Sequence, residues 1–143
     1  MNMALTEEAL AEYRILDVRI PSTVDYNQDV EWICRSFGFL EARDKRKTAA
    51  RIFKLLLEAA REGKGLSSDE LAAKIGLTRG TVVHHLNKMI KGGLVIYHEG
   101  QYKLRGRSLR STLGEIERDI NRVFENLYKV AVSIDETLGL PNR

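Results

Sequence analysis

The chain of 143 residues is predicted to be mostly α-helical, with one small β-hairpin and a long C-terminal coiled-coil helix. Apolar residues recur at helical spacing over most of the chain, which indicates amphipathic helices. One short run rich in β-branched and aromatic residues interrupts this pattern and predicts the hairpin. We divide the chain into an acidic N-terminal helical extension (1–42), a central domain (43–107) and a C-terminal dimerisation helix (108–143).

Three helices are expected before the centre of the chain. Thr6 can cap a helix, and the acidic residues after it favour a helix start there. Apolar residues at helical spacing predict a second short helix over 28–37, which Gly38 would end. A longer amphipathic helix is expected from about Asp44 to Arg61.

Two further short helices form a predicted helix-turn-helix. Ser67 and Glu70 have the spacing of a capping box, so a helix begins after Ser67. Gly76 allows a sharp turn, and Thr78 caps the next helix, which runs from about 79 to 91. Two helices joined by such a turn can place the second, the recognition helix, in the major groove of DNA.

The hairpin follows the helix-turn-helix directly. Residues 94–98 and 101–104 have strand character, and Glu99-Gly100 between them is a turn. A hairpin at this place is a wing, so the central domain is predicted to be a winged helix-turn-helix.

The last predicted helix runs from Ser108 to Leu138 and has an apolar seam with alternating spacings of four and three. This 3.5-residue repeat is typical of a coiled coil and favours a homodimer, although the seam could instead pack on its own domain. The seam residues, expected to mediate dimerisation, are Leu109, Leu113, Ile116, Ile120, Val123, Leu127, Val130 and Ile134.

Charge is unevenly distributed. Residues 1–42 carry three Lys/Arg against eight Asp/Glu, residues 43–110 carry sixteen against six, and residues 111–143 carry four against six. The central segment is therefore strongly basic and the segments on either side are acidic. A basic segment on a helix-turn-helix indicates double-stranded DNA as the partner, although a solvated basic surface would give the same count.

We expect the recognition helix to read bases and the wing to bind phosphates. Arg79 can pair with guanine, and Asn87 can hydrogen-bond a base or a phosphate. Lysine and arginine on the wing would bind the backbone without reading sequence. The expected DNA-binding residues are Thr78, Arg79, Gly80, Thr81, Val83, His84, Asn87, Lys88, Lys103, Arg105 and Arg107.

The stretch 66–89, followed by Gly93-Leu94-Val95, resembles the ArsR-type winged-helix repressors. Their T-V-x-x-H-L motif is matched here by Thr81, Val82, His85 and Leu86. The resemblance covers about residues 44–105 and the terminal helix, and an archaeal branch of winged-helix regulators fits equally well. It implies a homodimer that binds a partly palindromic operator and controls transcription. Metal-sensing members carry a Cys-x-Cys motif in the first helix of the pair. This chain has Leu71, Ala72, Ala73 and Lys74 at that place and no cysteine, so metal sensing is not implied.

Other classes of function have less support. Cys34 is the only cysteine, which excludes an intramolecular disulfide and a cysteine-rich zinc site, and we expect it to be buried. His84 and His85 point about 100° apart on a helix, so no metal site is expected. We find no catalytic set of residues, and we expect neither enzymatic activity nor a cofactor.

The chain has no long apolar run and no basic, apolar leader, so we expect a cytoplasmic protein without a membrane segment. The main alternative to a DNA-binding regulator is a winged-helix module for protein interaction or assembly that does not read DNA sequence. No feature identifies a small-molecule effector.

Overall fold

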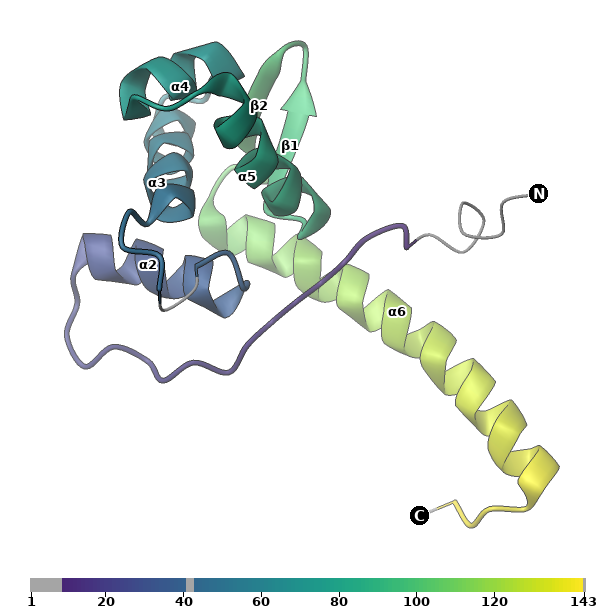
Figure 1. The fold of residues 1–143 in the computed structure, drawn as a ribbon. Helices are drawn as coiled ribbons and strands as arrows, with labels where there is room; N and C mark the ends of the chain where they lie inside the picture. The colour runs from purple at the N-terminus through teal and green to yellow at the C-terminus, as the bar shows by residue number, and fades with distance from the viewer. Residues whose placement is uncertain (1–8, 41–42, 143) are drawn as a thin grey trace.

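The computed structural model describes residues 9–40 and 43–142. It has the predicted fold class: a winged helix-turn-helix with a two-stranded antiparallel hairpin and a long C-terminal helix (Figure 1). The described part contains no helix with the length and apolar content needed to cross a bilayer. In chain order the elements are α2 (Tyr26–Ser36), α3 (Thr48–Arg61), α4 (Ser68–Ile75), α5 (Arg79–Lys91), β1 (Val95–His98), β2 (Gln101–Leu104) and α6 (Leu109–Leu138).

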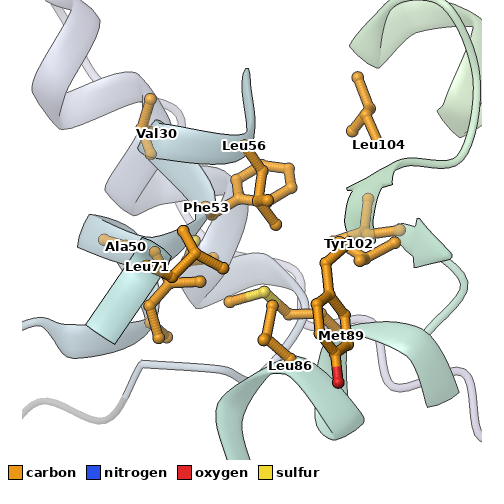
Figure 2. Packing of buried hydrophobic residues seen from close by; sticks show 14 of the residues in the cluster. Val30, Ala50, Phe53, Leu56, Leu71, Leu86, Met89, Tyr102 and Leu104 are labelled. Carbon is orange, nitrogen blue, oxygen red and sulfur yellow. The ribbon is translucent and has the colours of Figure 1, made fainter. Parts of the chain in front are cut away.

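One hydrophobic core joins these elements. Phe53 and Leu56 of α3 are fully buried, as are Leu71 of α4 and Leu86 of α5. Figure 2 shows side chains of α2, α3, α4, α5 and β2 gathered around this centre. Burying each large apolar side chain contributes about 1.5–3 kcal/mol, so this cluster holds the helix-turn-helix together. Val30 of α2 belongs to the same core, so part of the acidic N-terminal region is packed into the domain.

The helix-turn-helix has the caps that the sequence predicted. The Ser67 hydroxyl accepts a hydrogen bond from the Glu70 amide at 3.0 Å, and the Glu70 carboxylate accepts one from the Ser67 amide at 2.9 Å. Gly76 ends α4 with φ of 78°, a conformation that glycine adopts without steric cost. Thr78 caps α5 by accepting from the Thr81 amide. These local interactions fix the turn between the two helices.

The hairpin is in register, with Val95 opposite Leu104 and Tyr97 opposite Tyr102. Its two turn residues both have positive φ, which matches the right-handed twist of the strands. On the other edge of β2, Leu66 forms an antiparallel bridge to Tyr102. The wing is therefore attached to the segment between α3 and α4.

The sequence predicted a helix starting at Thr6, and this prediction is wrong for residues 9–25, which form neither helix nor strand. Residues 6–8 lie outside the described part. The backbone amide of Glu12 donates to the Lys91 carbonyl, and that of Leu16 donates to the Ser36 carbonyl. Because these hydrogen bonds reach α5 and α2, they replace the local bonds that a helix would need. We call residues 9–25 the strap, since they run along the body and cross α6 (Figure 1).

Helix α3 begins later than predicted, at Thr48 instead of about Asp44. The Asp44 carboxylate accepts hydrogen bonds from the amides of Arg46 and Lys47, and Lys47 has φ of 51°. An Asp side chain that binds nearby amides holds a turn and competes with the helix. The basic residues Arg43, Lys45, Arg46 and Lys47 therefore precede the helix.

Helix α6 has the predicted length but two different halves. In its first half Ile116 is 2% exposed and packs in the chain's own core, with Leu113 and Ile120 partly buried beside it. From Val123 onward the apolar side chains are exposed. This second half extends away from the body of the protein (Figure 1).

Candidate nucleic-acid interface

Helix α5 buries one side and exposes the other. Val82, Leu86 and Met89 are fully buried at helical spacing. The opposite side consists of residues with mainly polar side chains that were predicted to contact DNA. Among these, Val83 is half-buried, and the exposed ones are Arg79, Gly80, Thr81, His84, Asn87 and Lys88. The fold thus presents a continuous polar helix face to solvent.

The N-terminus of α5 favours an anion. No acidic residue lies in its first turn, so the partial positive charge of the helix end is not compensated there. Free amide groups at such an end are good phosphate ligands. The hydroxyls of Thr78 and Thr81 lie 2.9 Å apart and are exposed, so both remain accessible beside these amides.

Arg79 connects the two helices of the motif. Its Nε donates to the Ser68 hydroxyl at 3.1 Å and lies 3.9 Å from the Asp69 carboxylate. The side chain is still 70% exposed. The guanidinium is therefore oriented by α4 while much of it faces solvent, which suits a group that pairs with a base edge.

The two adjacent histidines of α5 have different environments. His84 is exposed, while His85 is half-buried and its ring lies 5.6 Å from that of His84. Burial lowers the pKa of His85 from 6.5, and the neighbouring His84 and Lys88 lower it further. His85 is therefore neutral near pH 7, while His84 is on the exposed face.

The three basic residues predicted for the wing differ in exposure and in ion pairing. Lys103 is half-buried on β2 and Arg107 is exposed after it. Arg105 is instead held by α6: its guanidinium lies 2.8 Å from Asp119 and 3.7 Å from Glu115. Its charge is thus largely compensated within the chain, whereas Lys103 and Arg107 form no ion pair with any residue that the structure describes.

The interaction of Arg105 extends to the strap. Tyr13 donates its hydroxyl proton to Asp119 at 2.9 Å, and Arg122 lies 3.2 Å from the same carboxylate. The hydrogen bond from Arg105 is the main reason that the pKa of Asp119 is lowered from 3.8. One carboxylate therefore joins the wing base, α6 and the strap. We call these four residues the Asp119 junction.

Sequence reasoning missed this junction and one other contact. Arg51 of α3 donates to the Ile75 carbonyl at 2.9 Å, where it binds the C-terminal end of α4. Tyr13 and Asp119 are 106 positions apart, and Arg51 and Ile75 are 24 positions apart. The only signal in the sequence was the excess of acidic or basic residues in each of the three segments of the chain. Such an excess does not show which residue pairs with which.

The predicted dimerisation residues fall into two groups. Leu109, Leu113, Ile116 and Ile120 contact the chain's own core. The other four are exposed: Val123 by 43%, Leu127 by 56%, Val130 by 61% and Ile134 by 52%. Within residues 9–40 and 43–142, no three His, Cys, Asp or Glu side chains converge as a possible metal site.

Residues 46–98 match a family model described as a helix-turn-helix domain. The match spans α3, both helices of the motif and β1, which is a little over a third of the chain. A search of curated proteins and a search of solved structures each found no match. Together with the exposed face of α5, the matched domain indicates a DNA-binding protein.

Proposed function

We propose that this protein is a sequence-specific transcription regulator that binds double-stranded DNA as a homodimer. The exposed face of α5, within a segment that matches a helix-turn-helix domain, is the observation that carries this proposal. The first turns of α5 would enter the major groove, where Arg79 contacts a base edge and the helix N-terminus binds a phosphate. Asn87 and Lys88 lie further along the same exposed face.

The wing supports backbone contact in this arrangement. Lys103 and Arg107 would bind phosphates beside the groove, which adds affinity without adding sequence preference. Arg105 has a different role: its ion pair with Asp119 would hold the wing base against α6. This assignment keeps the predicted wing contacts except for Arg105.

The exposed half of α6 supports the homodimer. Its apolar residues continue a 3.5-residue repeat beyond the chain's own core, and a solvent-exposed apolar stripe of this length favours a partner helix. A second copy supplies an identical stripe, so the twofold pair is self-complementary. Two recognition helices would then lie about 34 Å apart, one turn of DNA.

Selection of bound sequences from random duplexes tests this proposal. We expect an enriched, partly palindromic site with half-sites about one helical turn apart. Gel-shift affinity for that site should fall steeply with salt, with a log–log slope of roughly −0.9 per neutralised phosphate.

Absence of DNA binding at low salt would reject the regulator. The exposed apolar half of α6 would then favour the second candidate, an interaction or assembly module. Binding without enrichment of any sequence would leave a DNA-binding protein without specificity.

A further inference from the structure

A hollow of about 730 Å³ lies between the C-terminal end of α3, strand β2 and the start of α6. None of its lining residues belongs to α4 or α5, so it is separate from the recognition face. Its basic lining residues come from several elements and are Arg61, Lys64, Lys103, Arg105, Arg107 and Arg118.

Most of this positive charge is not compensated inside the chain. Among the ion pairs of the described residues, none involves Arg61, Lys103, Arg107 or Arg118. Glu115 is the one acidic lining residue, and its carboxylate lies 3.7 Å from Arg105, which is paired more closely with Asp119 at 2.8 Å. Four cations of the lining therefore have no ion-pair partner among the described residues, and the same lining contains one carboxylate.

The start of α6 adds to the same potential. Gly106 and Ser111, on either side of the helix N-cap, line the hollow, and the first turn of this 30-residue helix has no acidic residue. The helix end therefore contributes further positive potential. A side chain at Gly106 would lie 2.5 Å from the Ser111 hydroxyl, so glycine is needed for β2 to approach the helix start this closely.

We propose that this hollow binds a small anion that carries two or more phosphate groups. Guanidinium groups bind phosphate oxygens in pairs, and three of the four uncompensated cations are arginines. The volume exceeds that of a single phosphate, and the lining cations come from three different elements: Arg61 from α3, Lys103 from β2 and Arg118 from α6.

Occupancy of the hollow would also regulate the proposed function. Lys103 and Arg107 line the hollow and are the wing cations that we assign to the DNA backbone. An anion that neutralises them would remove phosphate contacts and lower the affinity for DNA. This regulatory step rests on the proposed function, whereas the anion site itself does not.

The test is a calorimetric titration of the full chain with tripolyphosphate, without DNA and at constant ionic strength. We expect saturable binding of one anion per chain. Arg61→Gln and Arg118→Gln should each weaken it about tenfold, as expected for the loss of a charge-assisted hydrogen bond. Arg110→Gln is the matched control, because Arg110 is an exposed arginine of α6 that does not line the hollow. It should change affinity by less than about twofold, and circular dichroism should show all three variants folded.

Two results would overturn the site. Equal weakening by all three variants would show that only the overall charge matters. No binding of tripolyphosphate, together with weaker DNA binding of Arg61→Gln and Arg118→Gln, would show that these cations contact backbone phosphate only. If tripolyphosphate binds at the hollow but no duplex is bound, the anion site stands and the proposed function fails.

Discussion

At the scale of single residues, position on α5 decides what each side chain can do. Arg79 is held by Ser68 through one nitrogen while the side chain remains largely exposed. Orientation by a neighbouring helix reduces the entropy lost when the guanidinium meets a base. Val82, three residues after Arg79 on the same helix, is fully buried and belongs to the core.

Replacement of Arg79 tests base reading. We expect Arg79→Ala to weaken binding to the selected site by about 1–3 kcal/mol and to relax the preference at one base pair. Lys103→Ala is the control, because loss of the phosphate contact that we propose for Lys103 should weaken binding to every duplex similarly. Competition assays with single-base variants of the site distinguish the two; a uniform loss for Arg79→Ala would show that it contacts only phosphate.

His85 gives the fold a specific pH dependence. Its pKa is lowered below 6.5, so the unfolded chain binds a proton at a higher pH than the folded chain. The contribution of neutral His85 to the stability of the fold is therefore complete above pH 6.5 and is lost as the pH falls through the pKa of His85 in the folded chain. We expect urea unfolding at pH 7.5 and 5.5 to show a smaller pH effect for His85→Leu than for wild type.

Asn87→Leu is the control for this measurement, because Asn87 is exposed on the same helix and carries no titratable group. It should leave the difference between the two pH values unchanged. An identical pH effect in wild type and His85→Leu would contradict the assignment.

At the scale of elements, the Asp119 junction sets how the wing is placed. Asp119 of α6 accepts from Arg105 at the wing base and from Tyr13 of the strap. Its side chain is 13% exposed, so these charge-assisted bonds are only partly screened. The wing is thereby attached to the same helix that would carry the dimer contacts.

Removal of the Asp119 charge should destabilise the fold. We expect Asp119→Asn to lower the free energy of unfolding by roughly 1–3 kcal/mol, because Arg105 loses its closest anion while partly buried. The pKa of Asp119 is lowered, so its stabilisation is present above pH 3.8 and is lost as the pH falls below that value. In denaturant unfolding, the difference between wild type and variant should therefore be constant well above pH 3.8 and should narrow as the pH falls from 3.8 toward the folded pKa of Asp119.

Tyr13→Phe is the graded control for the junction. It removes only the hydrogen bond from the Tyr13 hydroxyl and keeps the ion pair with Arg105, so it should lower the free energy of unfolding by less than Asp119→Asn does. A larger loss for Tyr13→Phe than for Asp119→Asn would show that the strap is held mainly in another way.

At the scale of the whole molecule, α6 joins the folded domain to a proposed partner. Its first half completes the core through Ile116, and its second half exposes an apolar stripe. Covering an exposed apolar stripe with a partner removes it from water, which lowers the free energy and stabilises the complex. The dimer would thus be an extension of the same helix that closes the domain.

A charge placed in the stripe tests the dimer. We expect Leu127→Asp to yield folded monomers in sedimentation, because burying an unpaired carboxylate at the seam costs more than the interface supplies. DNA affinity should fall as well, since one half-site contact is lost. Val132→Asp is a matched control: Val132 is 52% exposed on the same helix but lies off the repeat. A dimer that survives Leu127→Asp, or one lost equally in both variants, would contradict the seam.

The sequence by itself determined what depends on near neighbours. The capping box at Ser67, the cap at Thr78, the turn at Gly76 and the length of α6 all follow from spacing within one or two helical turns. These interactions form between residues already close along the chain, so their pattern is visible in one dimension. The exposed face of α5 followed in the same way from helical periodicity.

Only the tertiary structure decided which distant residues meet. Tyr13 and Asp119 are 106 positions apart, and the walls of the cationic hollow come from α3, β2 and α6. The same holds for Arg105, whose charge looked free in the sequence and is paired in the fold. A charge in the sequence has many possible partners, and packing alone selects one, because ion pairs and cavities form between surfaces that folding brings together.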